Sequence, residues 1–108
     1  MQLISEAGQF SIEAGGGAHW VEQFRVPDLS VGTYSIPAGG TDGQSPHAED
    51  EIYVITAGRA TFVAGADAVA VRPGSVIYVP ALEAHRFTDV TEDLAALVLF
   101  APAEGSRG

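Results

Sequence analysis

Two histidines and a glutamate, in two separate segments, carry the side chains best suited to hold a metal ion. His47 and Glu51 lie in a first segment, residues 39–58, and His85 lies in a second, residues 74–89. Two imidazoles and one carboxylate suit a divalent first-row transition metal and leave coordination positions open on it. These residues therefore make the chain a candidate metalloprotein whose metal can bind a further molecule.

Whether His47 and Glu51 can reach one ion depends on where the strand that carries them begins. Alternate side chains of a strand share a face, so both residues would point the same way. Four residues of an ideal strand span about 13 Å, at ~3.3 Å per residue, which is too far for one ion. The side chains converge only if the strand bends, bulges or begins after His47. The glycines at 39–40 and Ser45-Pro46 give the chain that freedom.

Each candidate residue also has a simpler interpretation. His47 could be a surface histidine in a loop, and His85 a hydrogen-bonded structural histidine. The acidic run 49–51 would more often be a solvated turn. Glu51 differs from its neighbours because it heads the apolar segment 52–56, and a buried carboxylate there is costly unless it is paired or metal-bound.

Short segments rich in Val, Ile, Thr, Tyr and Phe, separated by glycines and prolines, predict an all-β protein. No segment combines enough length with a 3.6-residue period to predict a helix. Short strands at this spacing indicate an antiparallel sandwich or barrel, with a jelly roll as the leading choice. The expected strands are 9–13, 18–26, 29–36, 47–56, 60–64, 68–72, 75–79, 85–89 and 94–101.

Length and charge narrow the possible functions. The 108 residues suffice for a single domain, 1–108, with a flexible tail expected at 103–108. A net charge of −9 makes nucleic acid an unlikely class of partner. The absence of lysine and cysteine excludes a lysine Schiff base, a cysteine nucleophile and disulfides. No apolar run approaches the ~20 residues of a membrane helix, and the N-terminus does not resemble a signal peptide, so we expect a cytoplasmic protein without membrane contact.

The first segment resembles the first motif of the cupin superfamily. That motif runs Gly, five residues, His-x-His, three or four residues, Glu, six residues, Gly. Gly39, His47, Glu51 and Gly58 fit it, but Ser45 stands where the family has its first histidine. The neighbouring Gln44 could substitute for that histidine through its amide oxygen if the loop shifts.

The second segment resembles the second cupin motif, which runs Gly, five residues, Pro-x-Gly, two residues, His, three residues, Asn. Gly74, Pro80 and His85 fit this pattern without a gap. Leu82 replaces the motif's second glycine, and Asp89 replaces its asparagine. The two motifs together span about half of the chain, in the order that the family has.

The resemblance implies an antiparallel jelly-roll barrel (cupin fold) in which the two motif strands lie side by side. By position, the metal ligands would be His47, Glu51 and His85, with Ser45 or Gln44 as a further candidate. The ion would be a divalent transition metal, and these ligands accept Fe, Mn, Co, Ni, Cu or Zn. A cation would also relieve repulsion among the acidic residues between 42 and 51.

Three functional hypotheses follow. The chain could be a metal-dependent enzyme, of oxygenase or isomerase type, that acts on a small oxygenated molecule. It could instead be a non-catalytic cupin that binds a metal or ligand, or an accessory cupin whose site has decayed at Ser45. Glu49 and Glu83 are candidate proton carriers, although solvent exposure is the more common situation for both. We expect a homodimer, because the resemblance is to small cupins that commonly pair.

Overall fold

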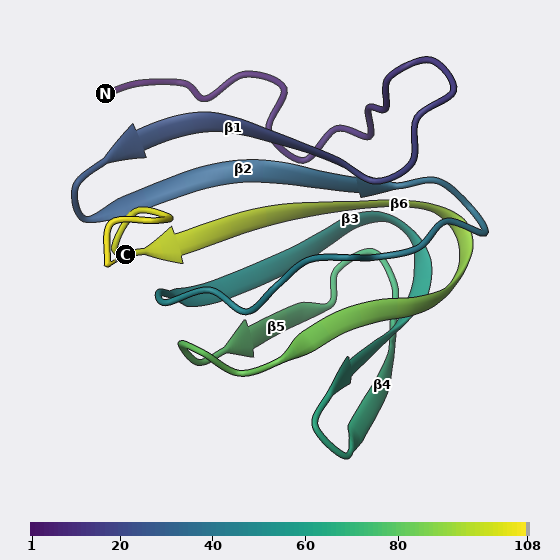
Figure 1. The fold of residues 1–108 in the computed structure, drawn as a ribbon. Helices are drawn as coiled ribbons and strands as arrows, with labels where there is room; N and C mark the ends of the chain where they lie inside the picture. The colour runs from purple at the N-terminus through teal and green to yellow at the C-terminus, as the bar shows by residue number, and fades with distance from the viewer. Residues whose placement is uncertain (108) are drawn as a thin grey trace.

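The fold consists of antiparallel β-strands joined by turns and loops, as predicted. The computed structural model describes residues 1–107 (Figure 1). Within those residues, no helix is long and apolar enough to cross a membrane. The strands are β1 (His19–Val26), β2 (Leu29–Ile36), β3 (Asp50–Ala64), β4 (Asp67–Val71), β5 (Val76–Val79) and β6 (His85–Ala101).

Two long strands, β3 and β6, each replace a pair of shorter strands expected from the sequence. The sequence segments 57–59 and 89–93 were predicted to be turns that separate two strands, and this prediction was wrong. They mark bends within β3 and β6, whose pairing register shifts at three places between Ile55 and Thr61. Gly58 sits at the bend with φ +85°, and an added Cβ there would lie 2.2 Å from the backbone oxygen of Asp93. Glycine therefore allows the two strands to touch where they bend.

The strand predicted at 9–13 is absent from the structure. β2 already pairs with β1 on one side and with β6 on the other, so its backbone cannot hydrogen-bond with a further strand. The N-terminal segment instead uses buried hydroxyls on β2. The amide of Gly8 donates to Thr33 Oγ1 at 2.8 Å, and the amide of Ser11 donates to Ser35 Oγ at 3.0 Å.

Strong curvature of β3 closes the fold. The sheet order is β1-β2-β6-β3-β4, with β5 also paired to β3. His85 pairs in register with Ala64, which is 64 − 51 = 13 residues from Glu51 along β3. A straight strand would separate these positions by about 43 Å at ~3.3 Å per residue. The His85 and Glu51 side chains nevertheless meet at 3.2 Å, so the ends of β3 face each other across a jelly-roll interior.

Aromatic side chains fill the interior beside this meeting point. Tyr53, Phe62 and Phe87 are at most 3% exposed, and their ring centroids lie 5.0–5.4 Å apart. The ring of His85 stacks on Phe62 with centroids 5.7 Å apart. Tyr78, on β5, does not belong to this aromatic core, since it is 57% exposed. The aromatic core fixes the position of the His85 ring.

Leu82 and Asp89, which replace the glycine and asparagine of the second motif, both have left-handed backbones. Their φ angles are +69° and +49°. Asparagine and aspartate tolerate this region, but a leucine there costs roughly 1–2 kcal/mol. Leu82 is also 72% exposed, so its side chain recovers little of that free energy by burial.

We therefore expect Leu82→Gly to raise the free energy of unfolding, by about 0.5–1 kcal/mol after allowing for the greater freedom of glycine in the unfolded chain. Urea denaturation measures the change. Leu82→Ala is the matched control, because it removes the same exposed side chain but keeps the strained backbone. An equal gain in both variants would contradict backbone strain as the cause.

Candidate functional site

A cavity of about 250 Å³ opens between the first half of β3, the second half of β6 and the first two strands. Its apolar wall is aromatic, with Trp20, Tyr34 and Phe100 from three different strands. Its polar wall contains Gln44, Ser45, His47, Glu51, Tyr53 and Glu104. None of these lining residues is an arginine or a lysine. The size and lining suit a small molecule that carries no negative charge.

Glu51 and His85 form a buried pair behind this cavity. His85 Nε2 lies 3.2 Å from Glu51 Oε1, and the two side chains are 1% and 2% exposed respectively. Two charged groups at this depth lose most of their hydration, so each depends on the other and on further hydrogen bonds. The structure therefore joins one predicted ligand from each motif.

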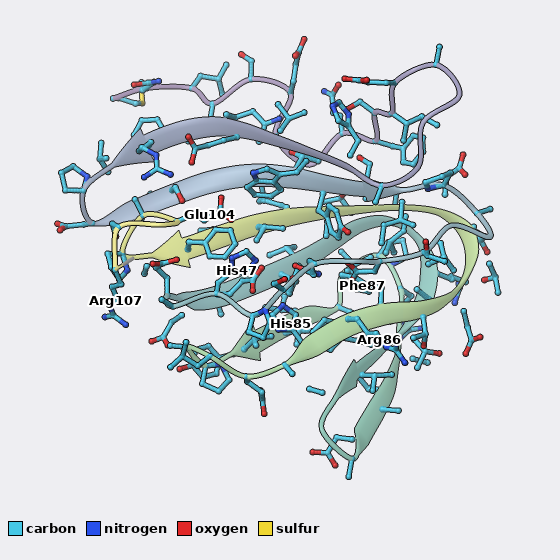
Figure 2. All side chains as sticks on the ribbon, viewed as in Figure 1. His47, His85, Arg86, Phe87, Glu104 and Arg107 are labelled. Carbon is cyan, nitrogen blue, oxygen red and sulfur yellow. The ribbon has the colours of Figure 1, made fainter. Side chains whose placement is uncertain are left out.

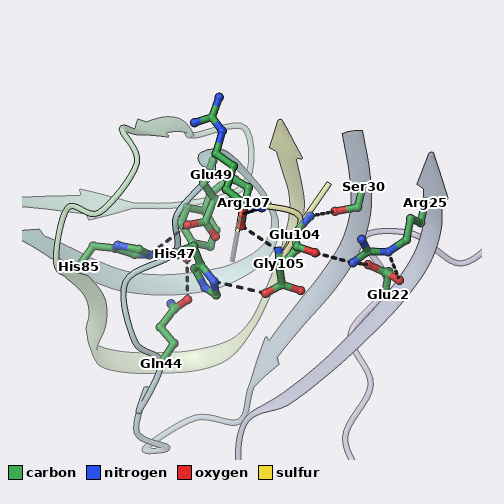
Figure 3. A network of polar contacts seen from close by, with 12 residues as sticks. Glu22, Arg25, Ser30, Gln44, His47, Glu49, His85, Glu104, Gly105 and Arg107 are labelled. Carbon is green, nitrogen blue, oxygen red and sulfur yellow. Dashed lines mark hydrogen bonds and ion pairs between the residues drawn. The ribbon is translucent and has the colours of Figure 1, made fainter. Parts of the chain in front are cut away.

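A chain of hydrogen bonds extends from this pair to the cavity wall (Figure 3). His85 Nδ1 lies 2.8 Å from the carbonyl oxygen of Glu83, to which it donates. His85 Nε2 also lies 3.0 Å from Tyr53 Oη, and Tyr53 donates to Gln44 Oε1 at 2.9 Å. Gln44 Nε2 in turn donates to Asp42 Oδ2 at 2.9 Å. Within residues 1–107, no buried side-chain nitrogen or oxygen lacks a partner.

The pKa values of His85 and Tyr53 are both displaced upward. Burial alone would lower the pKa of His85, but the Glu51 carboxylate and the Glu83 carbonyl outweigh it, so the pKa lies above the ordinary value. Burial, together with the nearby Glu51 charge, raises the pKa of the Tyr53 phenol. In the metal-free protein, a proton on His85 Nε2 can therefore bridge to Glu51, while Tyr53 remains a hydrogen-bond donor.

His47 lies beside this pair without joining it. β3 begins at Asp50, so His47 is outside the strand, as convergence requires. Its ring centroid is 6.3 Å from that of His85, whereas two imidazoles bound at right angles to one ion would be about 4.5 Å apart, given a metal–nitrogen length of ~2.1 Å. No three His, Asp or Glu side chains within residues 1–107 are grouped closely enough to hold one ion. An ion bound between Glu51 and His85 would therefore gain His47 as a third ligand only if the His47 side chain moved.

The two further ligand candidates differ in their surroundings. Ser45 is an exposed residue at the cavity wall. The side-chain amide of Gln44, in contrast, accepts a hydrogen bond from Tyr53 at its oxygen and donates one to Asp42 from its nitrogen. The predicted proton carriers also differ. Glu83 is exposed, but Glu49 is 2% exposed and accepts backbone hydrogen bonds from Gly105 and Arg107, at 3.0 and 3.1 Å. The carboxylate of Glu49 therefore has a structural role.

No sequence pattern indicated that Glu104 belongs to the site. Residues 103–108 were expected to form a flexible tail. In the structure, residues 103–107 form a turn against the cavity, and Gly108 lies outside the described residues. Glu104 Oε2 lies 3.3 Å from His47 Nδ1. Figure 2 labels the two side chains on the ribbon, and a dashed line joins them in Figure 3. No local motif marks Glu104, because contacts with residues more than 50 positions away place it there.

Comparisons with known proteins agree with this architecture. Residues 32–101 match the family profile of the Cupin domain. An uncharacterized protein of Streptomyces coelicolor is 46% identical over 91 residues, which cover 84% of this chain and 86% of that protein.

Two solved structures share the fold at low sequence identity. One is the DMSP lyase DddQ from Ruegeria pomeroyi, with a TM-score of 0.74 at 21% identity; the match covers 94% of this chain but only 54% of that one. The other is KdgF from a Halomonas species, with a TM-score of 0.72 at 19% identity, covering 87% of this chain and 94% of that one.

The buried carboxylate of Glu49 yields a stability prediction. In Glu49→Gln, one carboxylate oxygen becomes an NH₂ group that cannot accept the hydrogen bond it replaces. We expect this to lower the free energy of unfolding by about 1–3 kcal/mol, because the NH₂ group at this buried position then faces a backbone N–H and neither donor has an acceptor. Chemical denaturation measures the loss. The exposed Glu83→Gln serves as the control and should leave stability unchanged; equal stability of both variants would contradict the assigned role of Glu49.

Proposed function

Because the chain belongs to the cupin family, we propose that it binds a divalent transition metal through His47, Glu51 and His85 and acts as an enzyme on a small oxygenated molecule. The buried Glu51–His85 pair beside the cavity is the observation that carries this proposal. A metal bound there would supply a Lewis acid for chemistry of the oxygenase or isomerase type.

The hydrogen bonds of His85 support its role as a ligand. A metal-binding histidine commonly donates its second ring N–H to a carbonyl or carboxylate, which fixes the ring. His85 Nδ1 has such a partner in the Glu83 carbonyl oxygen, so Nε2 remains to face Glu51. A proton on Nε2 in the metal-free protein occupies the position that a cation would take, and metal binding should displace it.

The other residues would select and orient the substrate. The aromatic wall of Trp20 and Phe100, whose centroids lie 5.9 Å apart, would pack against its apolar part. The Tyr53 hydroxyl group, kept protonated by burial, could donate to a substrate oxygen if it releases Gln44. The lack of arginine and lysine in the cavity wall disfavours phosphorylated substrates.

A non-catalytic, ligand-binding cupin is the second candidate. It is favoured by the completeness of the hydrogen-bond network, which leaves no buried side-chain polar atom within residues 1–107 in need of a metal. Ser45 in place of the family's histidine also removes one ligand. In this case the cavity would bind a small molecule and the Glu51–His85 pair would be structural.

Calorimetric titration of EDTA-treated protein with Mn²⁺, Ni²⁺ and Zn²⁺ separates these candidates. We expect about one equivalent to bind, with release of a proton when His85 is protonated at the start. His85→Ala and His47→Ala should each weaken binding sharply, while His19→Ala, which alters a histidine outside both motifs, should not. Absence of metal uptake, or full affinity in His85→Ala, would contradict the metal site.

Catalysis can be tested on the metal-loaded protein. Elemental analysis of untagged protein identifies the metal that it carries, and a screen with enediols and diketones then follows oxygen uptake and isomerised products. Turnover that is lost in His85→Ala would support an enzyme. Metal binding without any turnover would contradict the proposed enzyme, whereas binding of a small molecule by protein that takes up no metal would favour the second candidate.

We also propose that the chain forms a homodimer. Val69, Val76 and Tyr78, on β4 and β5, are more than half exposed, which is unusual for large apolar side chains and suits an interface. Light scattering at micromolar concentration should give about twice the monomer mass of 11.2 kDa, and Val76→Glu should shift the mass towards the monomer. A monomeric mass for the wild type would contradict the dimer.

A further inference from the structure

The C-terminal turn, residues 102–107, is attached to the barrel at several points around the cavity (Figure 3). The Glu104 amide donates to Ser30 Oγ at 2.9 Å, and the Glu104 carbonyl accepts from Arg25 Nη2 at 2.7 Å. The next part of the turn is held by the buried carboxylate of Glu49, which accepts from the amides of Gly105 and Arg107. The backbone on both sides of the Glu104 side chain is therefore fixed.

This fixed backbone directs the Glu104 carboxylate at His47. Glu104 Oε2 lies 3.3 Å from His47 Nδ1, and the two side chains are 26% and 24% exposed. On its other side, the His47 ring packs edge-on against Phe100, with centroids 4.8 Å apart. His47 thus has a carboxylate at Nδ1 and an aromatic ring beside it, although it lies in a loop rather than a strand.

The position of the carboxylate determines which ring nitrogen of His47 carries the proton. A negative oxygen beside Nδ1 favours N–H at Nδ1 and leaves the lone pair on Nε2. His85 has the same arrangement, with Nδ1 facing the Glu83 carbonyl. The two histidines of the candidate site therefore both have an oxygen acceptor at Nδ1.

We propose that Glu104 is a positioning residue, which holds His47 in the tautomer that presents Nε2 as a metal ligand, and that the C-terminal turn is thereby part of the site. The role in metal binding rests on the proposed function, whereas the tautomer can be measured without metal. The opposite arrangement, in which Glu104 keeps His47 away from Glu51 and His85, predicts tighter metal binding once Glu104 is removed.

Two readouts test this role in wild type, Glu104→Ala and Glu104→Gln. The first is the tautomer of His47, from two-bond ¹H–¹⁵N NMR spectra of metal-free protein at alkaline pH. The second is the affinity for Ni²⁺ by titration calorimetry. Glu92→Ala is the matched control, because Glu92 is an exposed carboxylate whose contact is with Arg59, at 3.5 Å.

We expect the wild type to carry the His47 proton on Nδ1, and Glu104→Ala to shift it towards Nε2 and to weaken Ni²⁺ binding about 10–100-fold. Glu104→Gln, whose amide oxygen can still accept from Nδ1, should retain most of the affinity. Unchanged or tighter binding in Glu104→Ala would overturn the proposal. If the wild type binds no metal, the proposed function fails, and the tautomer alone decides: a wild-type proton on Nε2, or no change in Glu104→Ala, overturns the positioning role.

Discussion

The contact between Glu51 and His85 is the constraint on which the site depends. The two residues are far apart along the β3–β6 ladder, yet their side chains meet at 3.2 Å inside the fold. They can meet only because β3 and β6 bend, and the bend requires a residue without a side chain at Gly58. Curvature of the sheet, rather than local sequence spacing, is therefore what brings these two candidate metal ligands together.

A buried pair of this kind is stable only if its remaining polar atoms are satisfied. The hydrogen-bond chain through Tyr53 and Gln44 to Asp42 meets this requirement, and Asp42 also accepts from the Phe87 amide and the Tyr34 hydroxyl. Three of these residues, Tyr53, Gln44 and Tyr34, also line the cavity. The network that stabilises the pair consequently also determines what the cavity can bind, and it does so with acidic and neutral groups.

Sequence patterns predicted the strand class and most strand positions, because these depend on local composition. The resemblance to the cupin motifs indicated that Glu51 and His85 belong to one site, together with His47, but not that these two side chains contact each other directly. Sequence patterns did not predict that the turn signals near Gly58 and Asp89 would lie within strands, since a bend and a turn use the same residue types. They indicated that His47 lies near Glu51 and His85, but not that it contacts Glu104. That contact depends on the hydrogen bonds that Ser30, Arg25 and Glu49 make to the C-terminal turn, and these three residues belong to no common sequence motif.

We propose that Glu51 and His85 are two ligands of one divalent ion. A crystal of the protein grown with Mn²⁺ or Ni²⁺, with diffraction measured on both sides of the metal absorption edge, tests this proposal. We expect an anomalous difference peak about 2.0–2.2 Å from both His85 Nε2 and Glu51 Oε1. Glu51 and His85 still in direct contact, with no anomalous peak beside them, would contradict it.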